Sequence, residues 1–291
     1  MQETDAAPPP LWVWAWTAAL LALAALPLAF LEETPREDPH TAFNEKRLRA
    51  AVADAPDRVV VALGTSLLKY ATADDAKISE LLSRHLGSPV RFVRVIRHGG
   101  TLGDFEELID PIHRLAPELV VLEDDLLLAR HVDEPDRLEP VRREVKRRIK
   151  EALYLNPAND PAQEEASLQE EQLGQRCDPA APSQHREWLL KRYVDQYPYP
   201  AFGSIVSRPG RGATGMLIVE VPRMAALDEA VRSARARWQR EVSAAIGAVP
   251  YVRYPDPLPD RLFCDGSHML REGREIYTPW FVARVAEAMA R

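Results

Sequence analysis

Three residues of this sequence have the types that nucleophilic catalysis requires. Ser66 ends the short segment Gly64-Thr65-Ser66, while Asp265 and His268 lie near the C-terminus. A serine hydroxyl becomes nucleophilic when a base accepts its proton, and imidazole is a suitable base near neutral pH. Asp265 precedes His268 by three residues and can fix the tautomer of its ring. Together these residues predict acyl transfer through a serine nucleophile.

The stretch before Ser66 predicts where that serine lies in the fold. Residues 59–63 are all apolar, and an unbroken apolar run of this kind is typical of a strand buried on both faces. Ser66 would then lie at the carboxyl edge of a parallel sheet, where open α/β folds bind their ligands. The alternative is that Ser66 only caps the next helix, which is the commoner role of a lone serine at such a place.

The rest of the chain alternates apolar runs with helical patterns. Strands are expected at 59–63, 90–96, 119–122, 216–221 and 251–254, and helices at 43–53, 74–86, 104–115, 225–246 and 277–290. Pro111 should break the helix at 104–115. Strands that alternate with helices predict an α/β protein with a parallel sheet and right-handed crossovers.

Composition divides the chain into three parts. Residues 1–33 form an N-terminal tail and membrane anchor, residues 34–57 a juxtamembrane linker with a lead-in helix, and residues 58–291 the α/β domain. Within that domain, a region at about 130–213 interrupts the alternating pattern and is interpreted as a helical insertion. Its basic run at 142–150 fits either a solvated helix face or contact with anionic lipid or another polyanion.

The N-terminus carries a stretch that is long enough to cross a membrane. From Leu11 to Leu31 there are 21 residues without a charge, and a helix of about 20 apolar residues spans a bilayer core. Trp12, Trp14 and Trp16 lie at one end, as interfacial aromatic residues do. We therefore expect an uncleaved single-pass anchor in the lipid bilayer of the cytoplasmic (inner) membrane. A cleaved signal peptide is the alternative, which the lack of Lys or Arg before the stretch disfavours.

Charge and cysteine content exclude several classes of partner. The net charge is −7, so no basic surplus indicates nucleic acid. Cys177 and Cys264 lack the spacing of a zinc site, and the acidic segment Glu123-Asp124-Asp125 has no second cluster that would complete a metal site. No metal or cofactor is therefore expected. The two cysteines could pair in an oxidising compartment, which the sequence leaves open.

Three ordered blocks of the sequence resemble the SGNH, or GDSL-like, family of hydrolases and acyltransferases. The blocks are Gly64-Thr65-Ser66, Gly99-Gly100-Thr101-Leu102-Gly103-Asp104-Phe105 and Asp265-Gly266-Ser267-His268. The resemblance covers roughly residues 57–130 and 214–291. It implies a three-layer α/β/α, flavodoxin-like architecture in which Ser66, His268 and Asp265 are catalytic. It also implies that the backbone N–H groups of Ser66 and Gly99, or of Gly100 in place of Gly99, bind the oxyanion.

The segment after the third predicted strand departs from that family's pattern. After the third strand the family usually supplies an asparagine side chain to the oxyanion hole, whereas this sequence has Glu123-Asp124-Asp125. A carboxylate there would repel an oxyanion unless it is protonated or turned away. Asn159-Asp160 contains the asparagine that this segment lacks, but it follows a helical pattern instead of a strand.

The resemblance and the anchor together predict a membrane-anchored serine esterase or O-acyltransferase of the cell-envelope O-acetylation type. Its expected substrates are acyl esters, in particular acetyl esters, of a carbohydrate or cell-envelope polymer, and a multi-spanning membrane acyltransferase is the candidate partner. The resemblance favours a periplasmic, extracytoplasmic domain, whereas the basic residues between Arg36 and Arg49 favour a cytoplasmic one. Two alternatives stay open. The missing asparagine suggests a non-catalytic accessory protein, and the anchor with the basic run suggests a lysophospholipase-type lipid esterase.

Overall fold

The computed structural model describes residues 39–53, 58–98, 100–130, 196–198, 215–225, 227–229 and 249–291, together with residues 10, 12–17, 19, 236, 240 and 244. The chain divides into two compact units, Met1–Asp38 and Pro39–Arg291. The candidate catalytic residues all belong to the second unit.

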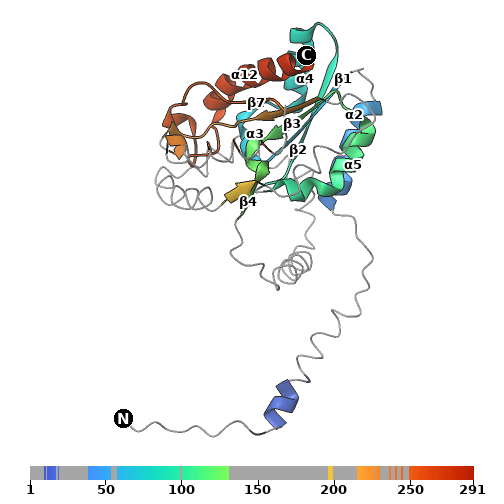
Figure 1. Ribbon diagram of the computed structural model, residues 1–291, viewed down its shortest axis with the longest axis vertical. Helices are drawn as coiled ribbons and strands as arrows, with labels where there is room; N and C mark the ends of the chain where they lie inside the picture. The colour runs from blue at the N-terminus through green and yellow to red at the C-terminus, as the bar shows by residue number, and fades with distance from the viewer. Residues whose placement is uncertain are drawn as a thin grey trace. The chain divides into compact units, whose positions relative to one another are not determined.

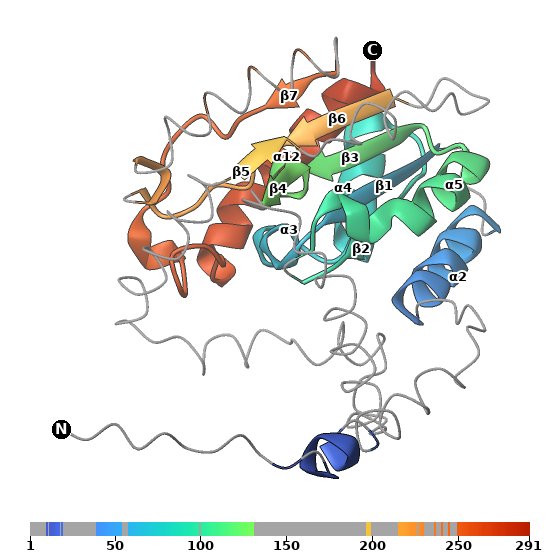
Figure 2. The same ribbon diagram turned by 60° about the horizontal axis from the view of Figure 1, so that its bottom comes forward.

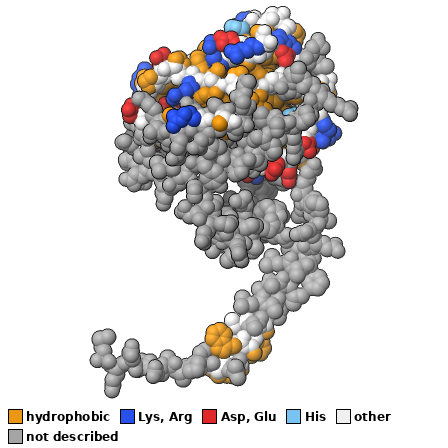
Figure 3. All heavy atoms as spheres, viewed as in Figure 1, with side chains coloured by type: hydrophobic (Ala, Val, Ile, Leu, Met, Phe, Trp, Pro, Cys, Tyr) orange, Lys and Arg blue, Asp and Glu red, His pale blue; other side chains and the backbone are white. Residues whose placement is uncertain are grey.

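The first unit holds a helical segment at residues 12–17. Trp12, Trp14 and Trp16 are exposed on it, and Figure 3 shows hydrophobic side chains there. Most of the stretch from Leu11 to Leu31 lies outside the described residues. Over the residues that the structure describes, no helix has the length and apolar character needed to span a bilayer. The membrane anchor stays a prediction from the sequence.

Five parallel strands form the central sheet of the second unit (Figures 1 and 2). They are β1 (Arg58–Gly64), β2 (Val90–Ile96), β3 (Leu119–Glu123), β6 (Gly215–Val219) and β7 (Tyr251–Val252). Their order across the sheet is β2-β1-β3-β6-β7, and every neighbouring pair is parallel. The predicted parallel α/β sheet is therefore confirmed, although β6 and β7 end before the predicted residues 221 and 254.

The strand order reverses beside β1. The chain passes from β1 to β2 on one side and then returns to place β3 on the other side of β1. Open α/β sheets bind their ligands at such a reversal, beyond the carboxyl ends of the strands. Ser66 directly follows β1 and Glu123 ends β3, so both residues lie at this point of the sheet.

Helices cover both faces of the sheet, which gives three layers (Figure 2). One face carries α2 (Pro39–Ala53) and α5 (Glu106–Leu115), and the other carries α3 (Ser66–Ala71), α4 (Asp75–Leu86) and α12 (Arg271–Met289). Along β1, Val61 and Leu63 join the core under α2 and α5, whereas Val60 and Ala62 join the opposite core. The strand is thus buried on both faces, which explains its unbroken apolar run.

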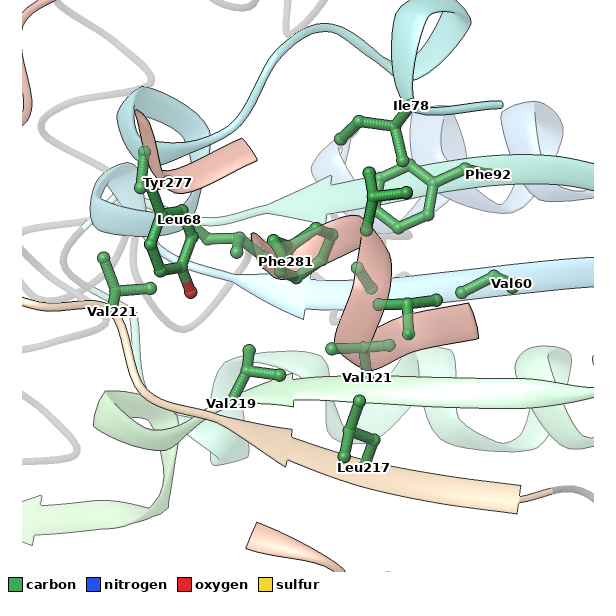
Figure 4. Packing of buried hydrophobic residues seen from close by; sticks show 14 of the residues in the cluster. Val60, Leu68, Ile78, Phe92, Val121, Leu217, Val219, Val221, Tyr277 and Phe281 are labelled. Atoms are coloured by element: carbon green, nitrogen blue, oxygen red, sulfur yellow. The ribbon is translucent and has the colours of Figure 1, made fainter. Parts of the chain in front are cut away.

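Figure 4 shows the core between the sheet and the helices α4 and α12. Val60, Phe92 and Val121 from the strands pack there with Ile78 of α4 and Phe281 of α12. The rings of Phe92 and Phe281 meet edge to face with their centroids 5.9 Å apart. Each such buried side chain contributes about 1.5–3 kcal/mol to stability. This packing holds α12 on the sheet and thereby places the loop that precedes it.

Three helices differ from the prediction. α2 begins at Pro39 instead of residue 43. α5 follows the 3-10 helix η1 (Leu102–Phe105) and continues through Pro111, so the expected break there is wrong. Pro111 lies on the buried face of α5, where packing offsets the single backbone hydrogen bond that proline removes. α12 begins at Arg271 instead of residue 277, because its exposed first turn and Gly273 give no apolar pattern in the sequence.

Of the predicted insertion at about 130–213, the structure describes Arg130 and the segment 196–198. β4 (Leu128–Arg130) and β5 (Gln196–Pro198) pair antiparallel in a separate two-stranded sheet. The basic run at 142–150, Asn159-Asp160 and Cys177 lie outside the described residues, as does most of the predicted helix at 225–246. Cys264 lies inside them and is disulfide-bonded.

Candidate active site

Ser66 and His268 meet at the carboxyl edge of the sheet. Ser66 is the first residue of α3 and follows the cap residue Thr65, while His268 lies in the loop before α12. The Oγ atom of Ser66 is 2.8 Å from the Nε2 atom of His268. This is a hydrogen-bond distance at which a hydroxyl proton can pass to imidazole.

Asp265 contacts the other side of the His268 ring. Its Oδ2 atom is 2.6 Å from His268 Nδ1, and its Oδ1 atom accepts the N–H groups of Ser267 and His268 at 3.1 and 2.9 Å. Burial raises the pKa of Asp265, but the hydrogen bonds and charge of His268 lower it by more, so the net pKa lies well below its usual range. An ionised Asp265 only accepts hydrogen bonds. Nδ1 therefore carries a hydrogen, and Nε2 presents its lone pair to Ser66.

Gly266 allows the Asp265–His268 loop to take this shape. Its φ of 87° is a left-handed conformation that favours glycine, and its carbonyl oxygen accepts the Met224 N–H at 3.0 Å. A Cβ atom at position 266 would lie 2.8 Å from the Met224 sulfur. Glycine is needed here both for the backbone angle and for the close approach of Met224.

Tyr70 packs against the ring of His268. The two ring centroids are 5.2 Å apart and the planes are nearly perpendicular, at 85°. Tyr70 follows Ser66 by four residues in α3, so both side chains lie on one face of that helix. Tyr70 was not predicted as a site residue, although its i, i+4 spacing from Ser66 was the available signal.

The carboxyl group of Glu123 contacts the turn that carries Ser66. Its Oε2 atom accepts the N–H groups of Thr65 at 2.6 Å and Leu68 at 3.3 Å, and its Oε1 atom accepts the Thr65 hydroxyl at 2.7 Å. Burial and the nearby charge of Asp125 raise the pKa of Glu123 to about 8, against the opposing effect of the Thr65 hydrogen bonds. The carboxyl group of Glu123 is therefore engaged with the turn that carries Ser66 and is biased toward its protonated form.

Asp124 and Asp125 have different partners from Glu123. Both lie in the 3-10 helix η2 (Asp124–Leu127) and are buried. Asp124 accepts the Tyr251 hydroxyl at 3.0 Å, and Asp125 forms an ion pair with Arg223 at 2.6 Å. Among the described residues, no group of three or more His, Cys, Asp or Glu side chains could hold a metal ion. Arg223 is another residue that the sequence analysis missed, since an arginine after a strand carries no signal of burial.

Three backbone N–H groups were expected to bind the oxyanion, those of Ser66, Gly99 and Gly100. The Ser66 N–H is the first of α3, and the first N–H groups of a helix have no acceptor within it. Gly99 lies outside the described residues. The N–H of Gly100 donates to the Arg97 carbonyl oxygen at 3.0 Å and is therefore used within its own turn. Ser66 is thus the expected donor that the described site offers to an oxyanion.

The sequence matches no protein-family model, and no curated protein matches it. Among solved structures, a lipase from a goat rumen metagenome matches at 10% identity and a TM-score of 0.40, over 79% of this chain and 98% of the lipase. A lipase from Streptomyces rimosus matches at 14% identity and a TM-score of 0.34, over 79% of this chain and 99% of that lipase.

An acetyl xylan esterase from Butyrivibrio proteoclasticus also matches, at 9% identity and a TM-score of 0.35. That match covers 81% of this chain but 65% of the esterase, so the chain spans just under two thirds of its length. Scores of this size do not assign a function. The geometry around Ser66 is therefore the basis for the proposal that follows.

Proposed function

We propose that this protein is a serine esterase or O-acyltransferase in which Ser66 is the nucleophile. The observation that carries the proposal is the 2.8 Å contact between Ser66 Oγ and His268 Nε2. Asp265 completes the donor–acceptor series behind His268 at 2.6 Å. A non-catalytic accessory protein would have no need of this series, which joins residues from opposite ends of the domain in the order that catalysis requires.

The reaction has two halves. First, Ser66 Oγ bonds to the ester carbonyl carbon while its proton moves to His268 Nε2. The carbonyl oxygen becomes an oxyanion, which we expect the Ser66 N–H to stabilise. The bond to the leaving alkoxide then breaks, and the alkoxide takes the proton from His268. In the second half, water or a sugar hydroxyl gives its proton to His268 and bonds to the acyl carbon of the acyl-serine. The bond between that carbon and Ser66 Oγ then breaks, and Ser66 Oγ takes the proton from His268.

The substrate class that we propose is an acetyl ester of a carbohydrate or cell-envelope polymer. The resemblance of the three sequence blocks supports this class, and the predicted anchor would place the enzyme at the membrane, beside a multi-spanning acyltransferase. The disulfide at Cys264 supports an oxidising, extracytoplasmic compartment, because structural disulfides persist in such compartments. A lysophospholipase-type enzyme is the rival with the same chemistry.

A set of ester substrates tests the proposal on the full-length chain, purified in mild detergent. We expect p-nitrophenyl acetate to be cleaved faster than long-chain p-nitrophenyl esters, and a fluorophosphonate to label Ser66 covalently. Ser66→Ala should abolish both. Ser88→Ala is the matched control, because Ser88 lies before β2 at the opposite edge of the sheet.

Three outcomes separate the candidate functions. Preference for long acyl chains would favour the lipid esterase. Equal inactivity of the wild type and Ser66→Ala, without fluorophosphonate labelling, would favour the accessory protein. A transferase would be identified if p-nitrophenyl acetate and an added oligosaccharide gave more acetylated oligosaccharide than free acetate.

A further inference from the structure

The carboxyl group of Glu123 contacts the nucleophile turn, which we define as the segment Thr65-Ser66-Leu67-Leu68. Its hydrogen bonds go to Thr65, directly before Ser66, and to Leu68, two residues after it. Glu123 itself ends the neighbouring strand β3. One side chain therefore ties both sides of the nucleophile to the adjacent strand.

We propose that Glu123 is a positioning residue for the nucleophile, and that it holds the nucleophile turn in uncharged form so that Ser66 Oγ faces His268. The inference rests on the proposed esterase function. It adds to that site a residue that acts through Ser66 and not on the substrate.

Burial and surroundings favour the uncharged form of Glu123. Its side chain is 0% exposed, and within the described ranges no Lys, Arg or His pairs with it. A buried carboxylate without a cation is costly, and the group usually stays protonated instead. The negative charge of Asp125 acts in the same direction, which agrees with the raised pKa of Glu123.

The hydrogen-bond geometry accommodates the additional proton. A protonated carboxyl group keeps acceptor capacity and gains one O–H donor. Oε2 can go on accepting the N–H groups of Thr65 and Leu68, while Oε1–H donates to the Thr65 hydroxyl oxygen instead of accepting from it. The contacts with the nucleophile turn can thus persist in the protonated form, and an oxyanion formed at Ser66 then meets no negative charge from Glu123.

Other charged or titratable groups surround this position, and they come from several elements. They are Asp124 and Asp125 of η2, Glu220 and Arg223 after β6, Tyr251 of β7, His268 in its loop and Tyr277 of α12. Arg223 pairs with Asp125 at 2.6 Å. Burial, Asp125 and Asp124 raise the pKa of Glu123, and the hydrogen bonds of Thr65 oppose them.

Two substitutions separate the hydrogen bonds of Glu123 from its charge. Glu123→Ala removes the acceptor of both N–H groups, whereas Glu123→Gln keeps a carbonyl oxygen for them and supplies an N–H donor to Thr65, as the protonated acid does. Glu220→Gln is the matched control, because Glu220 is a buried carboxyl group at the end of the next strand and bonds Arg253. The readouts are kcat and KM on p-nitrophenyl acetate and the rate of fluorophosphonate labelling.

We expect Glu123→Ala to lower kcat and the labelling rate by about 100-fold with little change in KM, because a misplaced nucleophile slows only the chemical step. Glu123→Gln should stay within about threefold of the wild type near neutral pH, as a mimic of the protonated form. Equal rates for folded Glu123→Ala and wild type would overturn the inference. So would a Glu123→Gln enzyme as slow as Glu123→Ala, since that result would require the charge.

The pH dependence gives a readout that a merely structural role would not move. Above about pH 8 the wild-type carboxyl group loses its proton, so kcat should fall as negative charge appears near the oxyanion. Glu123→Gln cannot ionise and should show no such fall. Persistence of the alkaline decline in Glu123→Gln would overturn the uncharged role even if Glu123→Ala does not fold. Failure of wild type itself to react would instead overturn the proposed function.

Discussion

Ser66 Oγ and His268 Nε2 lie 2.8 Å apart although 202 residues separate them in the chain. The backbone around His268 explains how this distance is held. Phe263 and Met269 pair across the loop, and the Cys264 N–H donates to the His268 carbonyl oxygen at 2.8 Å. The histidine is therefore presented by a closed, hydrogen-bonded loop rather than by an open segment.

Replacement of Asp265 by asparagine should disable the base and leave substrate binding intact. An amide that donates to the ring would favour the wrong tautomer of His268, which lowers kcat by about 10⁴-fold with KM nearly unchanged. Steady-state kinetics on p-nitrophenyl acetate measure this. Asp256→Asn, at an exposed aspartate of the same C-terminal region, is the control. A loss of less than about tenfold would contradict the role assigned to Asp265.

Asp265 should also make stability depend on acid pH. Its pKa is depressed in the folded protein, so its contribution is present above the pKa of the unfolded chain, about 4, and is lost as pH falls through the folded value. We expect the free energy of unfolding of the wild type to exceed that of Asp265→Asn near neutral pH. Urea unfolding should show this difference shrinking toward about pH 3. A difference that is constant with pH would contradict the assignment.

Gly64 should tolerate no side chain, because it packs against both Leu68 and Glu123. A Cβ there would lie 2.6 Å from a Leu68 methyl carbon and 2.9 Å from Glu123 Oε2. Gly64→Ala is expected to destabilise by about 1–3 kcal/mol and to lower kcat by displacing Ser66. At the control position Gly215 the nearest contact is looser, 3.1 Å from a Leu119 methyl carbon, so Gly215→Ala should cost less. Thermal unfolding and kinetics compare the two.

Arg223 and Asp125 form a buried ion pair, so the effect of replacing one residue on the free energy of unfolding should depend on whether the other is present. Arg223 is 1% exposed, and Arg223→Met would leave the Asp125 charge without it, at a cost of about 3–5 kcal/mol. The double variant Arg223→Met/Asp125→Leu should recover most of that stability. Arg261→Met breaks an exposed pair with Glu272 and should cost about 0–1 kcal/mol. Denaturant unfolding gives all three values, and an additive double variant would contradict the pairing.

The strands could be predicted because their signal is local. β2 matches its predicted range, β3 extends one residue beyond its prediction, and β1 extends one residue further at each end. A strand covered on both faces must be apolar throughout, so the sequence reports its position directly. The extent of α5 and α12 could not be predicted, since packing of Pro111 and of the Gly273 turn depends on the rest of the fold.

The residue types of the site, their order along the chain and the strand that leads to Ser66 could all be predicted from the sequence alone. Only the tertiary structure decided that the Asp265–His268 loop reaches that serine, and that the carboxyl group of Glu123 accepts the N–H groups of the nucleophile turn. The physical reason is that strand and helix patterns are set by neighbouring residues. The pairing of Glu123 with Thr65 depends instead on the order of β1 and β3 in the sheet, and its protonation depends on burial, which no local pattern records.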